Sequence, residues 1–324
     1  MYNYYQQGAG FACPVRTETE TERKNRLLRR YGNIIGLTVA ISIFAFQVLF
    51  TVIFLIFPNA DGHLFDIWTQ IIYSLLLVVF PVLFMTRLAH RPLGRLVAAE
   101  RVPARLLWPI VGAMLGADMV ISFLAQPVSI GNYNAMVSGL PTGSPYLVAL
   151  IFITDCVVPA LTEEFAMRGV LLGLLRPFGD TFAVVASATV FSLMHGNMMQ
   201  APSAFCIGLL FGYIAVKTGS VWPGVIVHFA NNFISTLLQY FIQNSTDTAA
   251  EIANCLITAA FLVVGAVCIA YLSFSHKWLF SLKSGGDKPA ERLKYGRFFG
   301  SVGMIILYVL FGLMALLTLV SYGI

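Results

Sequence analysis

The sequence has few charged residues, and this scarcity excludes an ordinary soluble domain. Charged side chains make up 11% of its 324 residues, whereas hydrophobic residues make up 58% and the mean hydropathy is +0.80. A soluble domain carries roughly 25% charged residues. Together with its long apolar segments, this composition predicts an all-α polytopic membrane protein.

The sequence also lacks the short motifs of several enzyme classes. It has no CxxC pair, no HExxH zinc helix and no GxSxG nucleophile elbow, which argues against zincins and serine hydrolases. Asp118 and Asp155 are intramembrane acids, but neither lies in the GxGD pattern of aspartyl intramembrane proteases. We interpret them as polar helix contacts or pocket lining. Because no basic stripe is interleaved with aromatic residues, we expect no nucleic-acid partner.

Apolar segments of spanning or near-spanning length predict a bundle of about nine transmembrane helices. The fourth segment is long and the sixth is short, so eight is the alternative count. The predicted segments are 33–57, 66–86, 106–126, 146–175, 181–198, 203–217, 221–243, 252–274 and 298–321.

The basic residues alternate between successive connections, and this alternation predicts the orientation. Lys and Arg occur before the first segment, in 87–105, after the fourth and sixth segments and in 276–297, but not in the intervening connections. By the positive-inside rule, the N-terminus is expected in the cytoplasm and the C-terminus outside. No signal peptide or transit peptide is recognised, so we expect a bacterial plasma membrane.

This pattern divides the chain into four parts. We expect a polar cytoplasmic tail over 1–32, three N-terminal transmembrane helices over 33–126, a chemically active helix core over 146–243, and C-terminal transmembrane helices over 252–324. The last part includes the basic cytoplasmic loop 276–297, which we interpret as an ordinary positive-inside loop; an amphipathic piece against anionic lipid is the alternative.

Two adjacent carboxylates and an arginine interrupt the fourth apolar segment. Each such residue costs about 2.5–3.5 kcal/mol at the centre of a membrane helix, so three are expected to have a function. Glu164 and Arg168 are four residues apart and can pair on one helix face. Glu163 points about 100° away from Glu164, which leaves it free for chemistry.

Polar residues in the fifth and seventh segments are expected to reach the same membrane depth as Glu163. Counted from the cytoplasmic ends at about 1.5 Å per residue, Glu163, His195 and Asn232 lie roughly 20 Å deep and His228 roughly 14 Å. His228 and Asn232 share a helix face at a spacing of four residues. A shared polar pocket near the middle of the bilayer is therefore predicted.

These three motifs, in this order on successive helices, resemble the CPBP family of intramembrane proteases, the CAAX-protease and bacteriocin-processing group that includes the type II CAAX prenyl endopeptidases. The resemblance covers roughly residues 146–243 and rests on Glu163-Glu164-x-x-x-Arg168, Phe191-x-x-x-His195 and His228-x-x-x-Asn232. Met167 departs from the pattern, because many members have an aromatic residue just before the motif arginine.

The resemblance implies hydrolysis of a peptide bond in a membrane-associated peptide or protein substrate within the lipid bilayer. Glu163 would be the base, and His195 would hold or polarise the water. His228 and Asn232 would donate to the oxyanion, and Glu164 with Arg168 would anchor the site. In a metal-dependent variant, Glu163, His195 and His228 would instead bind Zn²⁺.

Two other functions stay open at this point. A catalytically silent scaffold or immunity protein could have the same fold, although the intact polar set argues against it. A proton- or ion-coupled transporter could also use intramembrane acids and histidines, but the sequence has no internal inverted repeat. The substrate could be a CAAX-like peptide, a bacteriocin leader or a membrane regulator.

Overall fold

The computed structural model describes residues 19–57, 62–125, 144–244, 247–281 and 288–321. These residues form helices, with no β-sheet among them, and the predicted all-α polytopic fold is confirmed. The N-terminal part comprises α1 (Glu20–Ile56), α2 (Gly62–Tyr73), η1 (Ser74–Val79), α3 (Phe80–Leu88), α4 (Leu93–Leu96) and α5 (Ala104–Ala125). The predicted outer loop 127–145 falls almost entirely outside the described residues.

The central part contains the segments that carry the polar motifs. One long, nearly continuous helical segment consists of α6 (Pro145–Phe152), η4 (Ile153–Val157), α7 (Val158–Glu164), η5 (Phe165–Leu171), α8 (Leu172–Leu175) and η6 (Arg176–Phe178). It is followed by α9 (Asp180–Met194), α10 (Ala201–Thr218) and α11 (Trp222–Asn244). The C-terminal part contains α12 (Asp247–Ser275), η7 (Lys277–Phe280), α13 (Lys288–Phe299) and α14 (Val302–Ser321).

Each of the nine predicted segments coincides with helical structure. Seven helices of the described part are long and apolar enough to cross a membrane. The two other predicted segments correspond to α9, an apolar helix of 15 residues, and α11, a helix of 23 residues that carries His228 and Asn232. Most residues of α9 are buried, whereas α11 also has exposed apolar side chains, such as Phe229, Phe233 and Leu237.

The N-terminal helix begins earlier than the sequence analysis expected. Residues 20–32 of the expected polar tail belong to α1, and Leu28 and Tyr31 are buried. A capping box explains the start, since Thr19 and Glu22 satisfy each other's backbone N–H groups. Residues 1–18 lie outside the described part.

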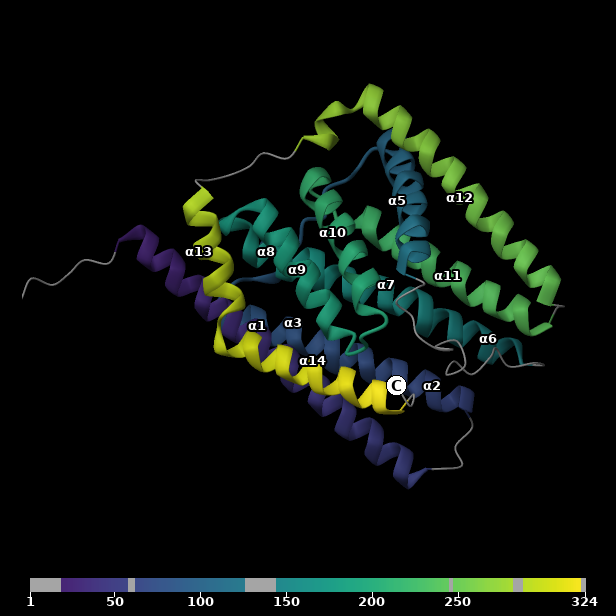
Figure 1. Cartoon of the computed structure of the whole chain (residues 1–324), viewed down its shortest axis with the longest axis horizontal. Coiled ribbons are helices and arrows are strands. Elements are labelled where there is room, and N and C mark those ends of the chain that lie inside the picture. The colour runs from purple at the N-terminus through teal and green to yellow at the C-terminus, as the bar shows by residue number, and fades with distance from the viewer. Residues whose placement is uncertain (1–18, 58–61, 126–143, 245–246, 282–287, 322–324) are drawn as a thin grey trace, which may run out of the picture.

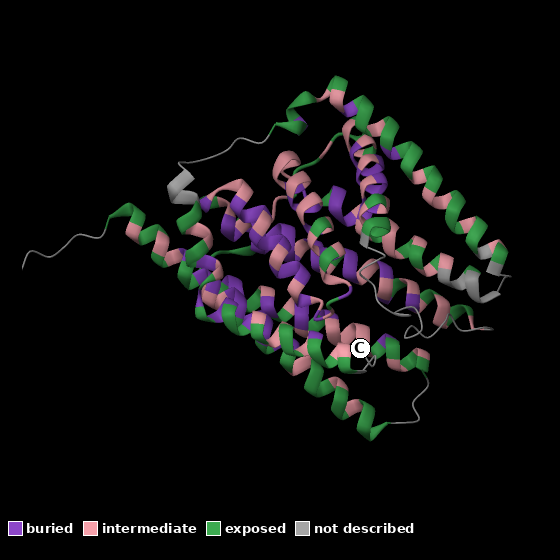
Figure 2. Cartoon of the chain, viewed as in Figure 1, coloured by how far each residue is buried: buried purple, intermediate pink, exposed green. Residues whose placement is uncertain are grey.

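The motif-bearing helices occupy the middle of the bundle. Figure 1 shows α7, α8 and α9 between α1 and α14 on one side and α5 and α12 on the other. Buried residues gather on these central helices, whereas α12 and the C-terminal half of α1 expose many residues (Figure 2). Exposed apolar side chains on the outer helices, such as Phe54, Val267 and Leu317, are suited to lipid contact.

Close backbone contact joins the outer helix α12 to α5. A Cβ built on Gly116 would lie 2.6 Å from the Cα of Gly265, and a Cβ on Gly265 would lie equally close to Gly116. Small residues at such a crossing let membrane helices approach closely. This contact fixes α5, which lies beside α10 and α11.

The orientation stays a prediction that single-cysteine labelling can test. In a cysteine-free background, Gly94→Cys in α4 should react with a membrane-impermeant maleimide from the cytoplasmic side, and Gly62→Cys at the start of α2 from the outside. Both positions are exposed, so accessibility will not limit labelling. Labelling of both positions from the same side would contradict the charge-based topology.

Candidate active site

Proline and two π-helical stretches shape the segment that carries the two glutamates. Pro159 lies at the start of α7, between the π-helical stretches η4 and η5. Proline inside a helix lacks the N–H that would bond to the carbonyl four residues earlier, which here belongs to Asp155. Widened π-turns are frequent at functional sites. The helical segment is thus irregular on both sides of α7, which ends with Glu163 and Glu164.

Glu164 and Arg168 form a fully buried ion pair. Nη1 of Arg168 lies 3.0 Å from Oε1 of Glu164, and the two side chains are 2% and 0% exposed. The guanidinium also lies over the rings of Phe191 and Phe211, at 4.3 and 5.2 Å from their centroids. The predicted pairing at four-residue spacing is observed, and the aromatic rings enclose the cation from α9 and α10.

His228 connects the two glutamates. Its Nδ1 lies 3.1 Å from Oε1 of Glu164, and its Nε2 lies 4.0 Å from Oε2 of Glu163. An ionised carboxylate can only accept, so Nδ1 of His228 carries the hydrogen in this contact. When His228 is also protonated at Nε2, the two carboxylates are balanced by two cations, His228 and Arg168.

His195 is oriented by its own helix. Its Nδ1 lies 2.7 Å from the carbonyl oxygen of Phe191, and the ring packs edge-on against the Phe191 ring at 4.8 Å. A carbonyl oxygen accepts, so Nδ1–H donates and Nε2 is the nitrogen left to interact with other groups. Phe191 therefore contacts His195 through both its carbonyl oxygen and its ring.

Asn232 is held by the irregular segment across the cavity. Its Nδ2 donates to the carbonyl oxygen of Asp155 over 2.9 Å. This is the carbonyl for which Pro159 cannot supply the α-helical donor. One amide hydrogen of Asn232 is therefore engaged, a contact that no local spacing in the sequence predicts. The second hydrogen is the one that can serve a substrate.

A single cavity brings these groups together. Its volume is about 450 Å³, and it is lined by Glu163 of α7, by His195 directly after α9, and by His228 and Asn232 of α11. Glu163 is only 5% exposed, whereas Glu164 is not part of the lining. A smaller cavity of about 180 Å³ shares His195, His228 and Asn232 and extends toward α5 and α10. The shared pocket predicted from membrane depth is thus present.

Residues 145–234 match a family model described as type II CAAX prenyl endopeptidase Rce1-like. The predicted resemblance to the CPBP family is confirmed. At the family level, this match supports an intramembrane CAAX-type protease. No curated protein and no solved structure matches the chain.

The larger of these two cavities is also lined by residues outside the matched region 145–234. Asp66, Gln70 and Tyr73 of α2, which precede the matched region, line the cavity, as does Gln200 before α10. By contrast, the sequence predicts α2 as part of the three N-terminal helices over 33–126, outside the core 146–243. A signal was present, because these three residues of α2 follow one another at spacings of four and three and so share a helix face.

The two intramembrane aspartates differ in their surroundings. Asp155 lines the cavity, and its side chain accepts a hydrogen bond from Thr154. Asp118 on α5 is 1% exposed, and neither of its carboxylate oxygens has a hydrogen-bond partner among the described residues. Asp155 therefore fits the expectation of pocket lining, whereas Asp118 lies buried beside the site.

The donor set does not form a metal centre in the part of the chain that the structure describes. No group of three His, Cys, Asp or Glu side chains there is arranged to hold a metal ion. Nδ1 of each histidine is bonded, to the carbonyl oxygen of Phe191 in His195 and to Glu164 in His228, so Nε2 is the one nitrogen of each ring that could bind a metal ion. Because the described residues contain no such group, we prefer a hydrolysis mechanism that uses the side chains of residues 145–234 alone.

Gly224 is predicted to be required for the position of the Glu164 carboxylate. A Cβ at residue 224 would lie 2.9 Å from Oε2 of Glu164, a buried atom that cannot retreat into solvent. Gly224→Ala should displace Glu164 from His228 and lower kcat at least tenfold, measured with any hydrolysed substrate. Gly312→Ala on α14, where nothing lies within 4 Å, is the matched control and should leave kcat unchanged. Equal kcat values for the two variants would contradict this role.

Proposed function

We propose that the chain is an intramembrane endopeptidase that hydrolyses a peptide bond in a membrane-associated substrate. The observation that carries the proposal is the single cavity lined by Glu163, His195, His228 and Asn232. A base, a water-orienting group and two oxyanion donors are the parts that peptide hydrolysis requires. The match to the Rce1-like family supports the same reaction class.

Glu163 and His195 are proposed to activate the attacking water. Glu163 is the carboxylate left without an arginine partner, and it faces the cavity. Because Nδ1 of His195 is bonded to Phe191, its Nε2 can accept one hydrogen of a water while Glu163 accepts the other. The water then presents a lone pair to the scissile carbonyl, and Glu163 takes the proton as the C–O bond forms.

His228 and Asn232 are proposed to stabilise the negative oxygen of the tetrahedral intermediate. The contact with Glu164 favours protonated His228, whose Nε2–H can then donate to the oxyanion. Asn232 offers the amide hydrogen that Asp155 does not use. The proton held by Glu163 finally passes to the departing amine as the C–N bond breaks. Substrates of this reaction could be CAAX-like peptides, bacteriocin leaders or membrane regulators.

The first test replaces the proposed base. Glu163→Gln keeps the size of the side chain but cannot take a proton, so we expect hydrolysis of a membrane-embedded or prenylated peptide to fall by about 10²–10⁴-fold. Glu251→Gln, an exposed glutamate at the start of α12, is the matched control and should retain full activity. The rates are measured with purified protein in lipid. Hydrolysis that survives in Glu163→Gln would contradict the role of the base, and a wild type without hydrolysis would favour a scaffold or a transporter.

The second test separates the metal-free mechanism from the zinc-dependent one. If the side chains suffice, exhaustive chelation should leave the turnover of the wild type unchanged, and added Zn²⁺ should not raise it. Metal analysis of the wild type and of His195→Ala and His228→Ala completes the test. Stoichiometric zinc that is lost in either variant, together with inactivation by the chelator, would overturn the metal-free mechanism.

A further inference from the structure

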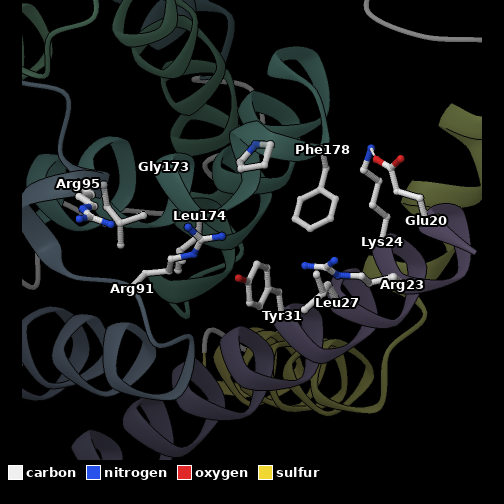
Figure 3. A pocket seen from close by; sticks show the side chains of 12 residues that line it. Glu20, Arg23, Lys24, Leu27, Tyr31, Arg91, Arg95, Gly173, Leu174 and Phe178 are labelled. Atoms are coloured by element: carbon white, nitrogen blue, oxygen red, sulfur yellow. Dashed lines mark ion pairs between the residues drawn. The ribbon is translucent and has the colours of Figure 1, made fainter. Parts of the chain in front are cut away.

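A cavity distinct from the candidate active site lies among the basic segments of the chain. Its volume is about 530 Å³, and residues of α1, of the α3–α4 connection with α4, and of α8 with η6 line it (Figure 3). None of the residues that line the proposed catalytic cavity lines this one. It is therefore a separate site.

The cavity has an excess of positive charge. Arg23, Lys24, Arg91 and Arg95 line it, and Glu20 is the one carboxylate among the lining residues. Oε1 of Glu20 lies 2.6 Å from Nζ of Lys24, so the charges of these two side chains largely cancel. Among the described residues, no carboxylate is bonded to Arg91 or Arg95. Guanidinium groups of this kind bind phosphate oxygens with paired, charge-assisted hydrogen bonds.

The arginines converge from different parts of the chain. In Figure 3, Arg23 from α1 and Arg91 from the α3–α4 connection reach in from opposite walls, with the Tyr31 side chain between them. Gly173 makes this possible, because a Cβ there would collide with the carbonyl oxygen of Leu96. The glycine lets α4 lie directly against α8 and thereby brings Arg91 and Arg95 to the rim of the cavity.

The remaining wall of the cavity is apolar. Leu27, Leu96, Leu174 and Phe178 line it, and Tyr31 packs edge-on against Phe178 with ring centroids 5.9 Å apart. Leu96, Leu174 and Phe178 are buried, so this wall is a fixed part of the core. A free phosphate ion would gain nothing from such a wall, whereas the glycerol backbone and acyl chains of a phospholipid would pack against it.

We propose that this cavity binds the phosphate headgroup of an anionic phospholipid. Basic pockets between transmembrane helices have this use, and polybasic membrane-proximal segments are attracted to anionic lipid. The bound lipid would join α1 and α4 to the end of the segment that carries Glu163 and Glu164. It would thus link the N-terminal helices to the catalytic core without entering the active site.

The test compares three lining arginines with three other basic residues of the same chain. Full-length purified protein is titrated with fluorescent phosphatidylglycerol, with phosphatidylcholine as the zwitterionic reference. R23Q/R91Q/R95Q should weaken phosphatidylglycerol binding by about 100-fold, and R91Q alone by about fivefold. R29Q/R101Q/R105Q removes the same charge from exposed arginines outside the cavity, and its binding should stay within about twofold of the wild type.

Each outcome decides the proposal. Equal losses in the two triple variants would show that only the overall positive charge attracts the lipid and would overturn the site. A wild type with no preference for phosphatidylglycerol over phosphatidylcholine would also overturn it. Inorganic phosphate that displaces the lipid fully at millimolar concentration would assign the cavity to a soluble phosphate instead. Thermal unfolding of R91Q, an exposed position, verifies that lost binding does not reflect lost folding.

Discussion

The structure of the site depends on the buried carboxylate of Glu164. A lone charge in this interior would cost several kcal/mol, and loss of one partner from a buried ion pair typically costs 3–5 kcal/mol. Oxygen Oε1 of Glu164 receives both the Arg168 guanidinium and Nδ1 of His228, from its own helix and from α11. The same contact therefore stabilises the fold and fixes a proposed catalytic side chain.

This arrangement explains how two adjacent glutamates acquire different roles. Oε1 of Glu164 is engaged by Arg168 and His228, and Glu164 is not part of the cavity lining, whereas Glu163 faces the cavity. Pairs of titratable groups in different environments are the usual basis for separate assignments in an acid–base mechanism. Because Glu164 bonds to Nδ1 of His228, the imidazole is oriented with its Nε2 on the side of Glu163. Glu164 thus sets the orientation of His228, the proposed oxyanion donor, relative to Glu163, the proposed base.

Much of this site could be predicted from local spacing. The four-residue interval between Glu164 and Arg168, and between Phe191 and His195, predicts contacts within one helix, and both are present. The membrane depths of Glu163, His195 and Asn232 predicted that these residues of three helices lie close together. Each depth follows from the number of residues between the polar residue and the cytoplasmic end of its segment. The spacing of Asp66, Gln70 and Tyr73 indicates a polar face on α2, but whether this face turns toward the cavity depends on how separate helices pack. The early start of α1 was readable, because Thr19 and Glu22 form the T-x-x-E pattern of a capping box.

The position of Asn232 on α11 depends on the irregular helical segment around Pro159. Pro159 has no N–H, so the carbonyl of Asp155 loses the donor that an α-helix would give it, and the flanking turns widen into π-helix. A carbonyl inside a membrane protein needs a donor, and Nδ2 of Asn232 supplies one. That bond immobilises the amide of Asn232, whose remaining hydrogen then needs little reorganisation to meet an oxyanion. The irregular backbone beside Glu163 is therefore part of what positions the opposite wall of the proposed active site.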